Sequence, residues 1–274
     1  MAQTAQYELG MLMPTAEWID LNDRLVFENP ELRKYVAPFP PPHLMQVVSG
    51  LTSESDFAAH GTTIYRAVQS ASPATISSYK SILDFGCGCA RLDRMFKGHP
   101  GVITGCDIDG RLVDWINEHL SYMHAVQTQP NALLPFDDSS FDAVISISVF
   151  THLNEDSQKL YLSELSRITQ SGAYLFLTIH GSRALERALT EERIFKMLEI
   201  PQEELDSAAT GMRAGVHNFI IHRSGHLTSG DYEYGITFIP ETYVRDVWGR
   251  NFEIIDIVKG AIHDFQDIVV CRRR

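Results

Sequence analysis

Gly86 and Gly88 lie at alternate positions in the stretch SILDFGCGCAR, residues 81–91, and are the residues best suited to bring the backbone close to a ligand. Glycine has no Cβ atom, so the chain can turn sharply there. The apolar residues before the glycines predict a strand that runs into a Gly-rich turn. A helix that begins after such a turn offers unpaired N–H groups to a ligand. The stretch therefore predicts a cradle for a cofactor.

An acidic residue comes after this turn at the spacing that ribose recognition needs. Residues 102–107, VITGCD, predict a second strand that ends in Asp107, about 20 residues past the glycines. A carboxylate at the end of that strand can accept hydrogen bonds from both hydroxyls of a ribose. The alternative role of Asp107 is to cap a helix ahead of Gly110. A dinucleotide fingerprint G-x-G-x-x-G would need glycine at position 91, where Arg91 stands instead.

The stretch resembles the first motif of class I S-adenosylmethionine-dependent methyltransferases, in which an acidic residue and one further residue precede alternating glycines. Asp84, Gly86 and Gly88 fit that motif, and Ala90 occupies the place of the third glycine. Residues 131–142 and the apolar run after them resemble the adenine-side loop and fourth strand of the same family. Many members have aspartate where this chain has Asn131, so the adenine amino group would meet an amide or a backbone acceptor. The resemblance covers residues 82–179 well.

The resemblance implies an α/β, Rossmann-like class I methyltransferase fold. Its sheet would be mostly parallel and seven-stranded, with an antiparallel final strand, and would carry a helical N-terminal segment and an insertion after the fifth strand. S-adenosylmethionine would be the cofactor of an enzyme that transfers its methyl group. The cofactor-binding residues carried over in this way are Asp84, Gly86, Cys87, Gly88, Arg91, Asp107, Ile108, Asn131, Ala132, Leu133, Ser146, Ser148 and Phe150.

Strands and helices alternate from Lys80 onward, which predicts a parallel sheet with crossover helices. The strands are expected at 81–85, 102–107, 122–127, 142–147 and 173–179, and a closing pair at 252–258 and 267–272 is separated by a Gly-containing turn. The helices are expected at 90–97, 110–120, 155–169 and 241–248, with Asn154 as the N-cap of the third.

Two segments lie outside this alternation. Residues 1–79 predict a helical leader or lid, with apolar residues at helical spacing in 18–27, a second helix over 53–68, and a proline run at 38–42 that stops any helix. Residues 181–235 predict an insertion over the entrance of the active site, with an amphipathic helix at 183–200. The methyltransferase domain that contains this insertion is expected to span residues 80–274. Both segments are expected to form the substrate wall. Tyr35, His60 and Tyr65 either line that wall or pack in the ordinary way.

Histidines are the candidate general bases, because imidazole titrates near neutral pH. His152 comes after the fourth strand and His180 after the fifth, so each could take a proton from a hydroxyl nucleophile, although a structural role stays open for both. A base among His217, His222, His226 and Glu233 is also open, as is catalysis by proximity alone. Those three histidines could be read as metal ligands, but polar loop residues explain them better, and no metal is expected.

Composition limits the partners. The chain has 274 residues, 44% of them hydrophobic, and a formal net charge of -12, which would repel a nucleic acid. The only dense basic run is the terminal Arg272–Arg274. The four cysteines include one C-x-C pair but no second pair at the spacing of metal ligands, which favours reduced thiols over a metal site. Residues 1–10 do not have the charged and then apolar pattern of a secretion signal, so we expect a cytoplasmic protein. No apolar run is long enough to span a membrane.

We therefore expect methyl transfer to a small molecule, at a hydroxyl oxygen of a sugar or secondary metabolite. A homodimer is left open as the assembly. The first alternative is a non-catalytic protein that binds S-adenosylmethionine, with the mouth closed by the insertion or serving a partner. The second is a nicotinamide-dependent oxidoreductase, which would share the α/β sheet but need different phosphate contacts.

Overall fold

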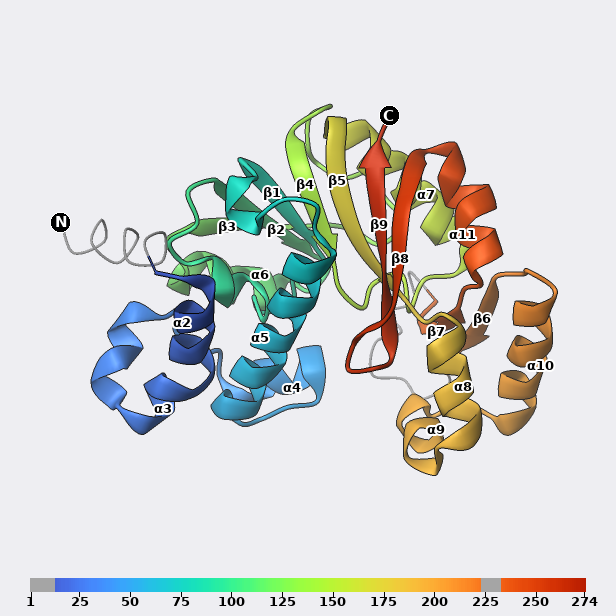
Figure 1. The fold of residues 1–274 in the computed structure, drawn as a ribbon, viewed down its shortest axis with the longest axis horizontal. Helices are drawn as coiled ribbons and strands as arrows, with labels where there is room; N and C mark the ends of the chain where they lie inside the picture. The colour runs from blue at the N-terminus through green and yellow to red at the C-terminus, as the bar shows by residue number, and fades with distance from the viewer. Residues whose placement is uncertain (1–12, 223–232) are drawn as a thin grey trace. The chain divides into compact units, whose positions relative to one another are not determined.

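The fold was obtained as a computed structural model, which describes residues 13–222 and 233–274 (Figure 1). The chain divides into two compact units, residues 1–128 and 129–274, and each is described by itself. The expected domain boundary at 79/80 lies inside the first unit and stays a prediction. In the part of the chain that the structure describes, no helix is both long and apolar enough to cross a bilayer.

The first unit carries three parallel strands in the order β3-β2-β1, namely β1 (Ser81–Phe85), β2 (Val102–Asp107) and β3 (Met123–Gln127). Helix α6 (Gly110–His119) connects β2 to β3. The first two strands begin and end as predicted, and the third begins one residue later. This parallel arrangement brings the C-terminal ends of β1 and β2 together, because Phe85 pairs in register with Cys106.

The described part of the leader, residues 13–79, is helical, as expected, and belongs to the first unit. Its first helical stretch runs without interruption through α2 (Thr15–Asp20), the π-helical η1 (Leu21–Leu25) and α3 (Val26–Glu28). The 3₁₀ segment η2 (Pro30–Tyr35), α4 (Pro42–Ser49), α5 (Glu54–Ala71) and the 3₁₀ turn η3 (Ile76–Ser78) come next. Helix α4 was not predicted. The proline run ends at its first residue, where proline is favoured because that N–H has no partner within a helix.

The helix predicted at 90–97 is wrong. Residues 90–92 form turns, and only the short 3₁₀ segment η4 (Asp93–Phe96) is helical. Ala90 has φ +63°, in the left-handed region, so a right-handed helix cannot include it. The segment ends at Phe96, because Lys97 has ψ +121°, outside the helical region. The Gly-rich turn therefore does not lead into the expected helix N-terminus with its unpaired N–H groups.

The second unit carries four strands in the order β4-β5-β9-β8, namely β4 (Phe141–Ser146), β5 (Thr169–Ile179), β8 (Phe252–Ile262) and β9 (Gln266–Arg273). Strands β4 and β5 are parallel, and β9 is antiparallel to both of its neighbours. Helix α7 (Glu155–Ile168) begins with the predicted cap, because Asn154 Oδ1 accepts the Ser157 N–H at 2.9 Å. Helix α11 (Glu241–Val247) and the 3₁₀ turn η5 (Trp248–Arg250) precede β8.

These seven strands confirm the predicted α/β fold, a mostly parallel sheet with an antiparallel last strand. The turn expected between the closing strands is placed differently. Gly260 lies within β8, and the chain reverses instead at His263 and Asp264, which have φ +56° and +53°. A short polar side chain such as aspartate tolerates this left-handed conformation better than most residues do.

The insertion in the second unit contains three helices and a small antiparallel sheet in its described part. Helices α8 (Ser182–Thr190), α9 (Glu192–Leu198) and α10 (Gln202–Arg213) precede β6 (Asn218–Ile221) and β7 (Gly235–Phe238). The single helix predicted at 183–200 is thus two helices, because Glu191 has extended backbone between them. Apolar residues of all three helices and both strands form a common core, which includes Leu205 and Phe238.

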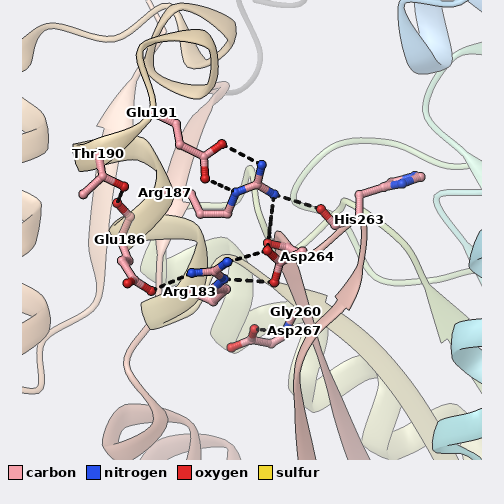
Figure 2. A network of polar contacts seen from close by, with 9 residues as sticks. All are labelled: Arg183, Glu186, Arg187, Thr190, Glu191, Gly260, His263, Asp264 and Asp267. Carbon is pink, nitrogen blue, oxygen red and sulfur yellow. Dashed lines mark hydrogen bonds and ion pairs between the residues drawn. The ribbon is translucent and has the colours of Figure 1, made fainter.

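An ion-pair network attaches α8 to the turn between β8 and β9 (Figure 2). The guanidinium of Arg183 donates to Asp264, with 2.9 Å between Nε and Oδ1. Arg187 Nη1 donates to the backbone oxygens of His263 and Asp264, both at 3.0 Å, and the rest of that guanidinium pairs with Glu191. Because Asp264 is 60% exposed while Arg187 is only 18% exposed, salt screens part of this network, which ties α8 to the turn.

Gly181, at the start of α8, has no room for a side chain. A Cβ there would lie 1.9 Å from Oδ2 of Asp267, a buried carboxylate whose Oδ1 accepts the Gly260 N–H at 2.8 Å (Figure 2). We expect Gly181→Ala to lower the free energy of unfolding by about 1–3 kcal/mol, the usual cost of overpacking. Urea unfolding measures this change in the free energy of unfolding. Gly249→Ala is the matched control, because a Cβ at Gly249 meets nothing within 4 Å. Equal stability of both variants would show that Asp267 moves aside freely.

Candidate cofactor and active site

The Gly-rich turn in the first unit is tied to the end of β2. Gly86 and Gly88 have φ +81° and +56°, which only glycine adopts without strain. The N–H groups of Gly86 and Cys87 donate to the Cys106 carbonyl oxygen at 2.9 and 3.1 Å. The Gly86 and Cys87 amides of the turn are therefore not unpaired donors for a ligand. Asp84, two residues before Gly86 on β1, is buried, and its role in cofactor binding stays a prediction.

Asp107 joins the turn to β2 through its side chain. Its Oδ2 accepts the N–H of Gly88 and its Oδ1 accepts the N–H of Asp109, both at 2.9 Å. Burial raises the pKa of this carboxyl, and the two backbone N–H groups oppose that shift. Each carboxylate oxygen has a second lone pair, so two ribose hydroxyls could still bind. The alternative role as a helix cap falls to Asp109 instead, whose Oδ1 accepts the N–H of Arg111 at 3.0 Å.

Leader helices α4 and α5 pack directly on the Gly-rich turn. A Cβ at Gly88 would lie 2.8 Å from a methyl group of Val48, and Cys89 Sγ lies 3.7 Å from the Leu44 carbonyl oxygen. From α5, His60 Nδ1 accepts a hydrogen bond from Arg91 Nη1 at 3.0 Å. His60 is thus a neighbour of a predicted cofactor residue.

The other leader residues named from the sequence show ordinary packing contacts. Tyr65 is buried with its ring 6.1 Å from that of Phe96, and the Lys34 ammonium lies 5.2 Å from the Tyr35 ring. All four cysteines are buried as free thiols, and burial raises the pKa of each. In residues 13–222 and 233–274, no three His, Cys, Asp or Glu side chains are grouped as metal ligands. The expectation that no metal is needed stays a prediction.

The loop at 131–133 belongs to the second unit and is held by α7. Asn131 has φ +54°, its Oδ1 accepts the Ser157 hydroxyl at 2.6 Å, and its N–H donates to the Tyr161 hydroxyl oxygen at 3.0 Å. Ala132 is half-buried, and Leu133 is 71% exposed, so an apolar side chain is presented to a ligand or to solvent. In the first unit, Ile108 is likewise exposed directly after Asp107.

Residues after β4 are fixed by contacts that the sequence did not indicate. Ser146 is buried, and Ser148 has φ +61° with its N–H donating to the Thr178 hydroxyl oxygen at 2.7 Å. The Ser148 hydroxyl lies 2.8 Å from Nε2 of Gln266 at the start of β9. Phe150 is fully buried with its ring 5.1 Å from that of Trp248. The cofactor roles of these residues stay predictions.

His152 and His180 come together in the second unit, with 6.2 Å between their ring centroids. The Nδ1–H of His152 donates to the Gly235 carbonyl oxygen at 2.8 Å, which leaves Nε2 as an acceptor that faces the Tyr234 hydroxyl at 3.3 Å. His180 donates one ring N–H to the Thr237 carbonyl oxygen, while its Nδ1 is buried without a hydrogen-bond partner among the described residues. Both imidazoles thus present an unprotonated nitrogen. Tyr234, which the sequence did not single out, stacks on His152.

The electrostatics of this pair favour the neutral form. Burial lowers the pKa of His152 from 6.5 to about 4, and burial together with the neighbouring His152 lowers the pKa of His180 to about 3. At neutral pH neither ring carries a charge that would repel a cation. Because Nε2 of His152 already faces the Tyr234 hydroxyl, Nδ1 of His180 is the acceptor left to receive a proton from another hydroxyl, although it is a weak base in water.

These shifts predict that acid destabilises the fold. Between pH 6.5 and about 4 the two histidines bind protons in the unfolded chain but not in the folded one. Their contribution to stability is therefore complete above pH 6.5 and is lost as the pH falls. Urea midpoints from pH 7.5 to 4.5 measure this loss, which His180→Gln should reduce. The exposed His124→Gln is the control, and an equal slope in wild type and His180→Gln would contradict the assignment.

The remaining histidines are separate from this pair or outside the described residues. His217 lies near Tyr243, with ring centroids 5.4 Å apart, and burial lowers its pKa to about 4. His222 makes an edge contact with Tyr234, and Glu233 accepts from Asn154 Nδ2 at 3.3 Å. His226 lies outside the described residues. A base in the insertion stays a prediction.

A mostly parallel sheet with an antiparallel last strand, a Gly-rich turn after β1 and a carboxylate at the end of β2 together define the class I methyltransferase fold. The family model described as "Methyltransferase domain" matches residues 83–177, so both the turn and most of β5 fall within it. The chain therefore contains a class I S-adenosylmethionine-dependent methyltransferase domain, and S-adenosylmethionine is its cofactor.

Solved structures share the fold at low sequence identity. The PH0226 protein from Pyrococcus horikoshii superposes with a TM-score of 0.61 at 14% identity, covering 86% of this chain and 100% of that one. The 1,6-didemethyltoxoflavin-N1-methyltransferase of Burkholderia thailandensis, crystallised with 1,6-didemethyltoxoflavin and S-adenosylhomocysteine, has a TM-score of 0.52 at 12% identity, with coverage of 86% and 92%. These likenesses support the assignment of the fold.

A curated relative in Mus musculus, named "Probable tRNA methyltransferase 9B", is 28% identical over 115 residues. The matched part is 41% of this chain and 24% of the relative, so this chain covers about a quarter of that protein's length. The match indicates a related domain and carries no assignment of the methyl acceptor.

Proposed function

We propose that this protein transfers a methyl group from S-adenosylmethionine to a hydroxyl oxygen of a small molecule such as a sugar or a secondary metabolite. The observation that carries the proposal is the neutral pair His152 and His180, in which the buried Nδ1 of His180 has no partner among the described residues. A buried acceptor without a donor costs about 1–3 kcal/mol, which a bound hydroxyl would recover.

Residues of the first unit support cofactor binding, and residues of the second unit support acceptance of a proton. In the first unit, Asp107 lies beside the Gly-rich turn and retains lone pairs for ribose hydroxyls. The bound cofactor supplies a methyl group on a positively charged sulfur. In the second unit, the neutral imidazoles accept the proton of the attacking hydroxyl without repelling that positive charge beforehand. Positioning of the hydroxyl supplies the rest of the rate enhancement.

The charge of the chain favours a small acceptor over RNA. With a net charge of -12, a phosphate backbone would be repelled unless basic residues gathered locally, and the only dense basic run is Arg272–Arg274. The name of the Mus musculus relative makes tRNA the rival acceptor. We retain a cytoplasmic location and a homodimer as further proposals, the second of which light scattering in solution would decide.

Calorimetry with S-adenosylhomocysteine and with NAD is the first test. Binding of S-adenosylhomocysteine alone is the expected result, and binding of NAD alone would favour the nicotinamide-dependent oxidoreductase. Radiolabelled methyl transfer to a panel of hydroxylated small molecules, to their amine analogues and to bulk tRNA then identifies the acceptor. Transfer to amines or to tRNA only would overturn the hydroxyl proposal. Tight cofactor binding without transfer to any acceptor would favour the non-catalytic binding protein.

A further inference from the structure

The turn between β8 and β9 has a backbone conformation that its sequence does not favour. It is a two-residue hairpin turn, because the Phe265 N–H donates to the Ile262 carbonyl oxygen at 3.0 Å. The two central residues, His263 and Asp264, have φ +56° and +53°, a pattern of the type I′ turn, in which Asn-Gly and Asp-Gly are preferred. Neither residue is glycine, so this turn is strained relative to one that contains glycine. Such strain persists only where the surrounding structure holds it.

Two arginines of α8 hold this turn (Figure 2). Arg187 Nη1 donates to the carbonyl oxygens of both His263 and Asp264 at 3.0 Å, and Arg183 Nε donates to Asp264 Oδ1 at 2.9 Å. Arg187 is fixed in turn by Glu191, whose carboxylate oxygens accept from its Nε and Nη2 at 2.6 and 2.8 Å. Because this pair is bidentate and the Arg187 side chain is only 18% exposed, Arg187 is the better ordered of the two arginines.

The residues that follow the turn reach side chains at the ends of β4 and β5. The ring centroid of Phe265 lies 4.9 Å from that of His180, which comes directly after β5. The next residue, Gln266, donates from Nε2 to the Ser148 hydroxyl at 2.8 Å. Phe265 is buried in the core of the insertion. The position of the turn therefore determines where one aromatic wall of His180 lies.

Close packing keeps the rest of this segment from absorbing a shift of the turn. Asp267 Oδ1 accepts the Gly260 N–H at 2.8 Å, and a Cβ at Gly181 would lie 1.9 Å from Asp267 Oδ2 (Figure 2). Gly181 directly follows His180 in the chain. Because closely packed interiors transmit strain, a relaxed turn would move Phe265 rather than be taken up further along β9.

We propose that Arg187 is a positioning residue for methyl transfer, which holds the strained turn so that Phe265 fixes the imidazole of His180. This rests on the proposed function, in which Nδ1 of His180 receives the proton of the acceptor hydroxyl. Arg187 acts through the turn. Without its N–H donors the carbonyl oxygens of the two central residues lose their shared partner, the turn relaxes, and Phe265 leaves its place against His180. A misplaced base lowers kcat more than it changes substrate binding.

Steady-state kinetics of Arg187→Met test this, because methionine keeps an unbranched apolar side chain but has no N–H donors. We expect kcat to fall by about tenfold, with little change in KM for the acceptor or in the affinity for S-adenosylhomocysteine. The matched control is Lys196→Met on α9, which also removes a cation paired with a glutamate of its own helix, Glu192. We expect this control to keep the wild-type rate.

NMR of the His180 ring protons gives a second readout, which needs no acceptor. Their chemical shifts contain a ring-current contribution from Phe265, whose centroid lies 4.9 Å away. Arg187→Met should therefore shift these signals, which are identified by their loss in His180→Phe, and Lys196→Met should leave them in place. A role of Arg187 in stability alone predicts a lower melting temperature without this shift.

A double-mutant cycle shows whether Arg187 acts through the turn. His263→Asn combined with Asp264→Gly gives the turn its preferred Asn-Gly sequence, which favours positive φ at both positions without help from α8. In that background, the loss of kcat caused by Arg187→Met should shrink from about tenfold to less than about twofold, because the two changes act on the same backbone.

The proposal is wrong if Arg187→Met keeps the wild-type kcat, or if its loss persists undiminished in the Asn-Gly background. Unshifted His180 ring signals in Arg187→Met also overturn it, whether or not an acceptor has been found. In each case the proposed function stands as long as His180→Phe is slow. A His180→Phe variant with the full rate of methyl transfer would instead overturn the role of His180 in the proposed function, and the positioning role of Arg187 with it.

Discussion

Replacing His180 by phenylalanine is expected to slow methyl transfer by about 10²–10⁴-fold, with little change in the affinity for S-adenosylhomocysteine. Phenylalanine keeps an aromatic ring against Phe238 and Phe265, whose centroids lie 5.8 and 4.9 Å from that of His180, but it removes the Nδ1 acceptor. The loss should therefore appear in kcat. Steady-state kinetics with the acceptor found in the panel, together with calorimetry of S-adenosylhomocysteine, separate the two quantities.

The control is His217→Phe, because His217 also has a buried ring nitrogen without a partner among the described residues but lies beside Tyr243. We expect it to keep the wild-type rate. His152→Phe should behave like His180→Phe if the two imidazoles act together on one hydroxyl. Full rate in both variants would show that positioning alone carries the reaction. A loss confined to His217→Phe would place the base in the insertion.

Replacing Asp107 by alanine is expected to weaken cofactor binding by about 10- to 100-fold or somewhat more. Hydrogen bonds to a charged group contribute roughly 1.5–3 kcal/mol, and the ribose hydroxyls would lose theirs. The two backbone N–H groups now bound by Asp107, from Gly88 and Asp109, would also lose their acceptor. The melting temperature without ligand should therefore fall as well.

Asp109→Ala is the matched control for this variant. It removes the N-cap of α6 and should lower stability while leaving cofactor affinity nearly intact. Calorimetry with S-adenosylhomocysteine and thermal unfolding of both variants distinguish the roles. If Asp107→Ala lost stability but kept full affinity, Asp107 would only hold the turn, and the interpretation of its carboxylate as a ribose acceptor would be wrong.

The sequence predicted the strands and the helix start at Asn154 because their signals are local. Alternating or continuous apolar runs mark strands, and the side chain of Asn154 caps its own helix. The helix at 90–97 failed because the left-handed conformation of Ala90 is imposed by the fold, not by its residue type. The break at Glu191 was missed for a similar reason, since the sequence there contains neither glycine nor proline.

The candidate site was predicted only where a motif or a strand end marked a residue. Asp84, Asp107, His152 and His180 were found because each lies at or near the C-terminal end of a predicted strand. Arg187 was missed since it lay inside an expected amphipathic helix, where an arginine indicates a solvated face. Gln266 contacts Ser148 across the sheet from a distant antiparallel strand, and Tyr234 contacts His152 from the insertion. No local pattern encodes such pairs.

The packing of α4 and α5 on the Gly-rich turn has a consequence for where the folding unit begins. Sequence similarity to the family starts at residue 83, yet Val48 closes the space beside Gly88, and α5 passes so close that a Cβ at Gly61 would lie 2.5 Å from the Arg91 carbonyl oxygen. A fragment starting at residue 83 would expose this surface to water and lose the apolar burial of both helices. The leader and the turn should therefore unfold in a single cooperative transition, and a shortened chain should be a substrate for proteolysis rather than a smaller enzyme.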